Sequence, residues 1–171
     1  MCLAPCIRAS VSTQIMRRIV TTDFHRSPPV ARKDNQVKSS IKRSMTHIEK
    51  LALAKSFHAS LAGRDWATLR SLLDDRAEWR VPGDSLVSGH VVGAEAIVKR
   101  LQEIGAYGVK FTLEHILISA ENVALALHNT ARRDALSLDV HLATVCFIRG
   151  RKISSIETFT SDVEQVNAFF A

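Results

Sequence analysis

Hydrophobic and polar positions follow a regular pattern from residue 46 onward, and the first pattern has the period of a helix. Residues 46–49, Thr-His-Ile-Glu, have the form of a capping box, in which the first and fourth side chains each bond a backbone amide at a helix start. Leu53, Phe57 and Leu61 then recur on one arc of a helical wheel until Gly63. We therefore expect the folded part of the chain to begin with a helix ending near Gly63.

Shorter patterns fill the middle of the chain. Asp65 can cap a second helix, because apolar residues recur at helical spacing after it. Two short extended pieces are expected at 78–81 and 87–92, each bounded by glycine or proline. A third helix is predicted over 94–104, with its apolar residues on one side.

The last third of the chain alternates with a period of two, which is typical of strands. Long strands are predicted within 111–117, 123–128, 138–147 and 153–159, and Asp162 can cap a closing helix. Helices followed by consecutive strands with short turns indicate an α+β fold with a mostly antiparallel sheet. A curved sheet wrapped over helices would leave a hollow between the two layers.

Composition and charge exclude several classes of protein. The 171 residues are 46% hydrophobic, which suits one folded domain, and no apolar run reaches the roughly 18 residues of a membrane span. Residues 1–44 hold nine Lys and Arg against two Asp and Glu, so they account for more than the whole net charge of +6. The remainder is near neutral, and we therefore expect neither a nucleic-acid partner nor a membrane partner.

The first 44 residues read as a disordered basic extension, and residues 45–171 as the domain. The start of the extension is rich in arginine and lacks acidic residues, which is also the composition of an organelle transit peptide. A further alternative is that translation of the protein begins at Met45. Cys2 and Cys6 have no companion ligands for zinc, while Cys146 reads as a core residue. A reducing, cytoplasmic location is the simplest expectation.

Several small motifs, taken in order, resemble a known family. They are Leu-Ala-Gly-Arg-Asp-Trp at 61–66, Trp-Arg-Val-Pro-Gly at 79–83, Ser-Gly-His-Val-Val-Gly at 88–93 and Gly-Arg-Lys-Ile at 150–153. This arrangement resembles the SnoaL-like branch of the nuclear transport factor 2-like superfamily over residues 45–171. The resemblance implies a cone-shaped α+β barrel with an apolar pocket, frequently a homodimer through the convex face of the sheet. Members include polyketide cyclases, ketosteroid isomerase, dehydratases, epoxide hydrolases and proteins without catalysis.

The fold alone assigns no chemistry, so a catalytic function has to be judged from the residues at the positions of the family's catalytic groups. Ketosteroid isomerase uses a basic Asp together with a Tyr and a protonated Asp that donate hydrogen bonds. The resemblance places these groups at Val81, Phe57 and Ala143, where all three are missing. Steroid isomerisation by that mechanism is therefore not expected. An Arg-x-Asp spacing suited to epoxide hydrolysis occurs at 132–134, but at a predicted solvent-facing turn.

Histidines are the remaining candidates for catalysis. Asp139 and His141 share one face of a predicted strand, and His128 reaches the same face if the preceding hairpin has a two-residue turn. His141 could then act as a general base, with Asp139 orienting it and His128 stabilising developing charge. The alternative is that these are ordinary sheet residues or lie at a solvated rim.

The hollow is expected to bind a small, mainly apolar organic molecule without metal or cofactor. Two functions stay open: proton transfer by a cofactor-independent isomerase, cyclase or dehydratase, or a non-catalytic binding or assembly module. A hollow with converging His and Asp would favour the enzyme, and one filled by aromatic rings would favour the module. Trp79 could equally be a core plug, and His58 could face solvent. The candidate ligand-binding residues are Phe57, His58, Trp79, Val81, Phe111, Ala143 and Phe147.

Overall fold

The structure is a computed structural model that describes residues 44–171. The predictions about the basic extension, its transit-peptide alternative, Cys2 and Cys6 lie outside the described residues.

The two N-terminal helices begin and end where the sequence predicts. Helix α1 spans His47–Gly63, and its capping box is confirmed: the Glu49 amide donates to the Thr46 hydroxyl at 3.3 Å, and the Thr46 amide donates to the Glu49 carboxylate at 2.8 Å. Arg64 then adopts a left-handed conformation with φ of 56°, which ends the helix. Helix α2, Trp66–Leu72, is capped by the Asp65 carboxylate, which accepts from an amide in the first turn.

Six strands form one sheet in the order β2-β1-β6-β5-β4-β3. Neighbouring strands are antiparallel except β1 and β6, which run parallel. The fold is therefore α+β with a mostly antiparallel sheet, as predicted. The strands span Leu73–Val81 (β1), Gly89–Val92 (β2), Lys110–Ile118 (β3), Asn122–Arg133 (β4), Leu136–Arg149 (β5) and Lys152–Thr160 (β6).

Strand β1 differs most from its predicted bounds. It begins at Leu73, directly after α2, whereas the sequence predicts an extended piece only over 78–81. Strand β2 is shorter than predicted because residues 86–87 form a turn. Backbone pairing with β6 extends β1 toward its start, where Leu73 pairs with Ile153. Pairing with a distant strand therefore sets where β1 begins.

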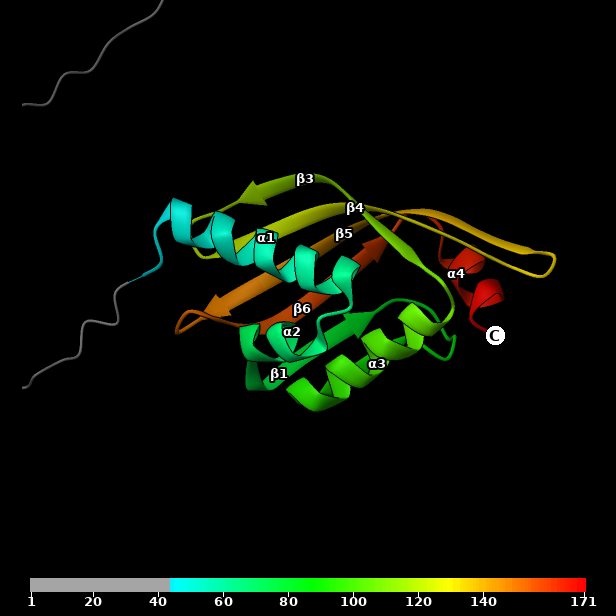
Figure 1. The fold of residues 1–171 in the computed structure, drawn as a ribbon, viewed down its shortest axis with the longest axis horizontal. Coiled ribbons are helices and arrows are strands. Elements are labelled where there is room, and N and C mark those ends of the chain that lie inside the picture. The colour runs from blue at the N-terminus through cyan, green and yellow to red at the C-terminus, as the bar shows by residue number, and fades with distance from the viewer. Residues whose placement is uncertain (1–43) are drawn as a thin grey trace, which may run out of the picture. The chain divides into compact units, whose positions relative to one another are not determined.

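The helices cover one face of the curved sheet (Figure 1). Helix α1 packs on β3 and β4, while α3, Ala94–Ala106, packs on β1. Helix α4, Val163–Phe169, is capped by Asp162 as predicted and packs against β5 at the other end. These contacts make the helix-covered face of the sheet the inner face and leave the opposite, outer face without a covering layer among the described residues.

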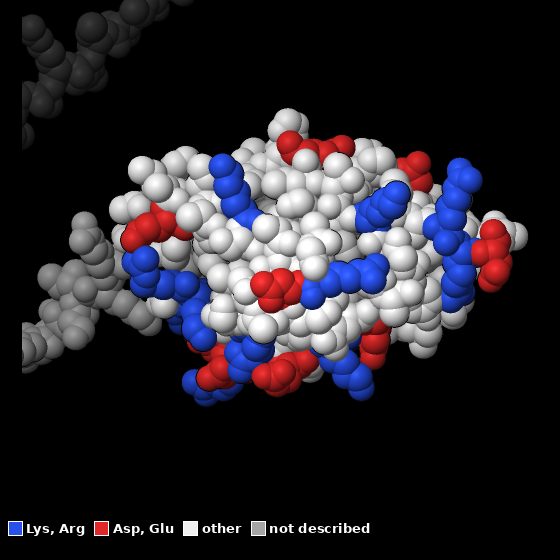
Figure 2. Space-filling model, viewed as in Figure 1, with Lys and Arg blue, Asp and Glu red and all other residues white. Residues whose placement is uncertain are grey.

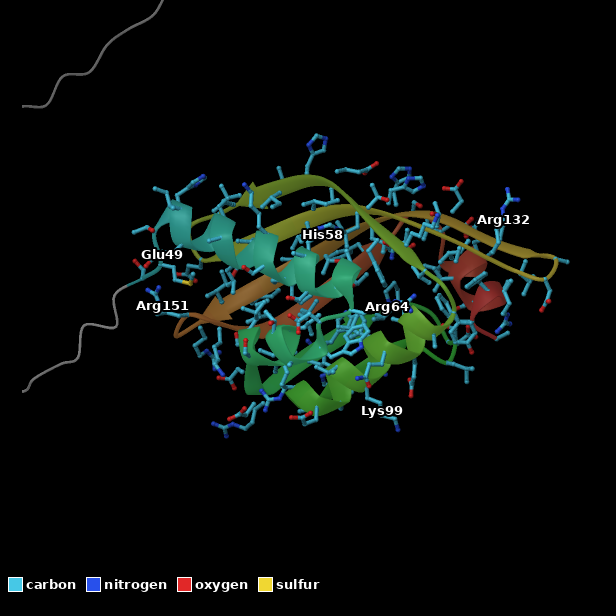
Figure 3. The ribbon with its side chains drawn as sticks, in the orientation of Figure 1. Glu49, His58, Arg64, Lys99, Arg132 and Arg151 are labelled. Atoms are coloured by element: carbon cyan, nitrogen blue, oxygen red, sulfur yellow. The ribbon has the colours of Figure 1, made fainter. Side chains whose placement is uncertain are left out.

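Polar contacts of one buried and one partly exposed side chain, Lys50 and Glu49, tie α1 to the rest of the fold. The Lys50 ammonium donates to the backbone carbonyls of Ser119 and Ala120, in the turn between β3 and β4. Near the same end of the helix, Arg151 donates to the Glu49 carboxylate at 2.9 Å, and the two side chains lie side by side in Figure 3. The helix is thus fixed over the sheet at its N-terminal end.

Alternation along β4 and β5 separates the two faces of the sheet. Val123, Leu125 and Leu127 are 1–3% exposed on the inner face, and Leu138 and Val140 continue that face on β5. Because successive side chains point to opposite faces, the residues between them lie on the outer face. The hairpin has a two-residue turn, since Arg133 pairs with Leu136.

No helix among residues 44–171 is both long and apolar enough to cross a membrane. On the helix-bearing face, positive and negative side chains are dispersed over the surface rather than gathered into a field of one sign (Figure 2). This distribution agrees with the near-neutral charge of the domain.

Candidate ligand chamber

A chamber lies between the inner face of the sheet and the helices. It offers about 80 Å³ to the centres of water-sized molecules, several times the roughly 10–15 Å³ that one water needs. Every helix except α2, and every strand except β2, contributes to its lining. The lining consists of Phe57, Leu61, Trp79, Val81, Pro82, Val87, Leu101, Ile104, Val109, Phe111, Leu127, Asn129, Leu138, Val140, Leu142, Thr144, Ile156, Thr158, Thr160, Val166 and Phe170.

Residues of α4 and just after it line part of the chamber. Val166 of α4 and Phe170 just beyond it line the interior. The Phe170 carbonyl accepts a hydrogen bond from the Leu86 amide, and the Asn167 side-chain oxygen accepts one from the Asp84 amide. Leu86 and Asp84 both lie in the segment between β1 and β2. This end of the chain is therefore held against the loop that follows β1.

Few polar groups face this apolar space, and one of them is unpaired. Trp79 donates from its indole nitrogen to the Thr158 hydroxyl at 3.0 Å. Asn129 is only 7% exposed, and within residues 44–171 its side-chain carbonyl oxygen has no hydrogen-bond partner. Buried polar groups in folded proteins are nearly always paired, so this oxygen marks a position where a ligand or a water can donate.

Titratable side chains are missing from the lining formed by the described residues. The polar members are one asparagine, three threonines and one tryptophan, none of which exchanges a proton near neutral pH. The described chamber can therefore bind and orient a molecule, but it offers no side-chain acid or base within it.

The charged side chain of Arg100 contacts Trp79, a residue of the chamber lining. Arg100 of α3 holds its guanidinium 5.8 Å from the centre of the Trp79 ring and donates to the Gly89 carbonyl at 3.1 Å. Partial burial lowers the pKa of Arg100 from its ordinary value. Arg100 is not among the lining residues, so its contact with the Trp79 ring adds no charge to the described lining.

The structure separates the predicted ligand-binding residues into two groups. Phe57, Trp79, Val81 and Phe111 line the chamber. His58 of α1 does not line it: its Nε2 lies 3.0 Å from the Phe111 carbonyl oxygen and so links α1 to β3 (Figure 3).

Ala143 and Phe147 lie on the outer face, which corrects their expected place in the hollow. Leu142 and Thr144 of β5 line the chamber, so the residue between them points the other way. Phe147 is 37% exposed on that outer side. The resemblance assigned Ala143 to the position of a catalytic Asp inside the pocket. In the structure Leu142 and Thr144 face inward there instead, and neither carries a carboxylate.

The predicted catalytic residues also lie on the outer face, and their expected convergence in the hollow is wrong. Val140 and Leu142 face inward, so Asp139 and His141 face outward. His128 pairs directly with His141 across the hairpin, so the two share a face as the two-residue turn requires, but it is the outer one. The sheet backbone separates all three side chains from the chamber.

On that outer face these residues contact one another closely. Nε2 of His128 lies 2.6 Å from an Asp139 carboxylate oxygen, and the rings of His128 and His141 stack with centroids 4.5 Å apart. Nδ1 of His141 lies 3.2 Å from an oxygen of Glu114, a residue that the sequence did not single out.

Asn129 was also missed, although a signal for it exists in the sequence. It continues the parity of Val123, Leu125 and Leu127, so a polar residue stands at the end of an apolar strand face. The threonines of the lining, Thr144, Thr158 and Thr160, have the same inward parity on β5 and β6.

The class of protein follows from the sheet and the chamber: a curved, mostly antiparallel sheet covered by helices around an apolar hollow is the nuclear transport factor 2-like fold. The profile of the SnoaL-like domain family matches residues 54–156, and the chain belongs to that family. No curated protein matches the sequence.

This chain matches solved structures of the same fold over nearly the whole length of those structures. Bal32a, from a soil-derived mobile gene cassette, is 26% identical with a TM-score of 0.70, covering 72% of this chain and 98% of its own. A nuclear transport factor 2-like protein from Burkholderia xenovorans is 20% identical with a TM-score of 0.66, covering 75% and 100%. TerC, co-crystallised with polyporic acid, is 13% identical with a TM-score of 0.63, covering 72% and 99%. The latter two show the fold alone.

Proposed function

We propose that this protein is a ligand-binding module that holds a small, mainly apolar organic molecule in the chamber, where the Asn129 carbonyl oxygen accepts a hydrogen bond from it. The observation that carries this proposal is the buried, unpaired oxygen of Asn129 inside an apolar lining. A buried acceptor without a partner costs about 1–3 kcal/mol, and a ligand donor would remove that cost.

The lining also defines the chemistry of the ligand. The described lining offers no charged side chain to pair with an ion, so a neutral molecule is favoured, because a desolvated charge without a partner is expensive. The aromatic and aliphatic walls favour a ring or a compact hydrocarbon, and Asn129 selects a hydroxyl or N–H group on it. TerC, which shares this fold, was co-crystallised with polyporic acid, which supports a small organic molecule as ligand.

Binding without turnover is better supported than proton transfer. General acid-base catalysis needs a titratable group within hydrogen-bond reach of the reacting atom. His141, Asp139 and His128 stand on the opposite side of the sheet from the chamber, so they cannot reach a molecule inside it. This arrangement favours the binding module over the isomerase, cyclase or dehydratase.

A second copy of the chain is the proposed partner of the outer face. Three apolar side chains are exposed there: Leu117 at 64%, Phe159 at 54% and Phe147 at 37%. They surround small residues, since Ala126 pairs with Ala143 and Ala143 with Phe159 across the central strands. An exposed apolar sheet face of this kind suits a self-complementary contact, as the family resemblance implies.

Titration with phenol, followed through the methyl signals of the full-length protein by NMR, tests the chamber. Phenol combines an apolar ring with one hydroxyl donor. Saturable shifts at Leu127, Val140 and Leu142, with no shift at the outer-face residues Ala124 and Val145, are expected. The variant His141→Ala should bind phenol as the original chain does. Shifts confined to the outer face, or unsaturable shifts spread over the surface, would contradict the proposal.

A further inference from the structure

The outer face carries a group of metal-ligating side chains that the chamber does not use. Glu114, His128 and His141 each offer one ligand atom, and these atoms all lie within 4.8 Å of one another. The three residues come from three adjacent strands, β3, β4 and β5. Strands in one sheet hold their side chains in fixed relation, so the group does not depend on a flexible loop.

Register places the two histidines together. His128 and His141 are directly opposed in the β4–β5 pair, and their rings are nearly parallel, with an interplanar angle of 11°. Directly opposed residues in an antiparallel pair have Cβ atoms only about 4.5–5.5 Å apart, which brings both imidazoles over the same spot.

A β-bulge supplies the carboxylate. The register between β3 and β4 shifts between Leu113 and His115, so Glu114 has no partner on β4. A bulge re-aims the side chain of the extra residue. Here the Glu114 carboxylate reaches across β4 to His141, with 3.2 Å between oxygen and Nδ1.

We propose that Glu114, His128 and His141 form a binding site for a divalent transition metal of the zinc type. Two imidazole nitrogens and one carboxylate oxygen are ligands that zinc prefers, with a fourth position left for water. Asp139 holds His128 through a contact of 2.6 Å at Nε2, which suits the carboxylate that commonly orients a metal-bound histidine. The site is independent of the chamber and of its ligand, but it shares the outer face with the proposed contact between two copies, so the metal and the second copy compete for that face.

One imidazole has to turn out of the stack before both can bind the same metal, because an imidazole nitrogen binds a metal in the plane of its ring and the two rings are nearly parallel. Nitrogen atoms around one tetrahedral zinc are roughly 3.3 Å apart, since each bond is about 2.0–2.1 Å. The present separations extend to 4.8 Å. The His141 side chain is 60% exposed and that of Glu114 36%, so both can rotate without disturbing the core.

Zinc titration of the full-length, chelator-treated and dialysed protein tests the site, with a chromophoric chelator as competitor. The original chain is compared with the double variant His128→Ala/His141→Ala. Both retain Cys2, Cys6 and His25, so their difference reports only on the histidine pair. Loss of one zinc per chain, or an affinity lower by at least about 100-fold, is expected.

Glu114→Gln provides a second variant, in which both histidines remain, and an affinity lower by about tenfold or more is expected. His90→Ala is the matched control. Nε2 of His90 also lies close to a carboxylate, 3.1 Å from an oxygen of Glu78, but among the described residues this pair has no third metal-ligating side chain, unlike the group of Glu114, His128 and His141. Equal zinc uptake by the original chain and the double variant would overturn the proposal, as would absence of zinc binding to the original chain or an equal loss in His90→Ala. Unchanged melting of each metal-free variant establishes that the fold persists.

Discussion

Trp79 and Thr158 are joined by a hydrogen bond of 3.0 Å that links the parallel strands β1 and β6 inside the chamber wall. Both side chains are buried, at 6% and 8% exposed. The bond satisfies the indole N–H in a region where apolar groups dominate. It therefore fixes the ring of Trp79 as a wall of the chamber while leaving Asn129 as the unpaired acceptor.

Replacing Thr158 by Val tests this wall. Valine keeps the shape of threonine but removes the acceptor, so the buried indole N–H of Trp79 loses its partner, and unfolding free energy should fall by about 1–3 kcal/mol. Urea denaturation measures the change. Thr144→Val, the same substitution in the same chamber, should cost less, because the Thr144 hydroxyl is not the partner of Trp79. Equal losses in both variants would show that the hydrogen bond has no special role.

Phe159→Glu tests the proposed self-association. The substitution places a charge on the most exposed aromatic ring of the outer face, and desolvating that charge in a contact between two copies is unfavourable. Light scattering coupled to size exclusion should give about twice the chain mass of 18.9 kDa for the original protein and the chain mass for the variant.

Leu86→Glu is the control for that experiment, because Leu86 is 68% exposed in the loop between β1 and β2 rather than on the sheet. It should leave the mass unchanged. A monomeric original chain, or a dimer that survives Phe159→Glu, would argue against the outer face as the contact.

Glu49 makes the start of α1 sensitive to acid. Its hydrogen bond from the Thr46 amide, together with the Arg151 side chain, lowers the pKa of Glu49 from 4.5 to about 2. A carboxyl whose pKa is lower in the folded state stabilises the fold above its ordinary pKa, and that contribution is lost as pH falls from 4.5 toward 2.

The variant Glu49→Gln should therefore melt at a lower temperature than the original chain at pH 7, with a difference that shrinks between pH 4.5 and 2. Thermal melts followed by circular dichroism at several pH values measure it. Arg151→Met should reproduce part of the loss, since it removes one of the stabilising partners. A difference between Glu49→Gln and the original chain that stays constant over this range would contradict the assignment.

Cys146 should be chemically inert in the folded protein. It is fully buried, and burial raises the pKa of its thiol to about 12, so almost no thiolate is present near neutral pH. In a Cys2→Ser/Cys6→Ser variant, where Cys146 is the remaining thiol, Ellman's reagent at pH 8 should react only after denaturant is added. Rapid labelling without denaturant would mean that β5 opens locally.

Local signals in the sequence predicted the helices and their starts well. Each helix start depends on a side chain that accepts from a backbone amide only a few residues away, so nearby residues are enough to predict it. The residues concerned are Thr46 with Glu49, Asp65 and Asp162. Alternation along β4 and β5 likewise predicted two strands, but it left the length of the turn between them open, and the structure has a turn of two residues.

The face that each strand presents was harder to predict, because it depends on partners far away in the chain. Alternation puts Asp139 and His141 on one side and Val140 and Leu142 on the other. The resemblance places Ala143 in the pocket and so assigns the inner face to the first set, whereas the structure assigns it to the second. A one-residue offset exchanges the two faces of a strand completely. Leu138 and Val140, at 3% and 1% exposed, show that the apolar set of this strand faces inward.

Two further features have no local signature. The bulge at Glu114 depends on how β3 pairs with β4, so the meeting of Glu114 with His141 could not be predicted from strand parity. The parallel pairing of β1 with β6 joins segments separated by about half of the chain, and it determines that Trp79 meets Thr158.

The affinities of phenol and toluene for the original chain and for Asn129→Leu test the central claim most directly, because the two ligands differ only in a hydroxyl against a methyl group. The original chain should bind phenol more tightly relative to toluene than the variant does, by about fivefold, the worth of one hydrogen bond of about 1 kcal/mol. NMR titrations followed at the chamber methyl groups measure all four dissociation constants. The same preference for phenol in both proteins, or no binding of either ligand to the chamber, would contradict Asn129 as the ligand's acceptor.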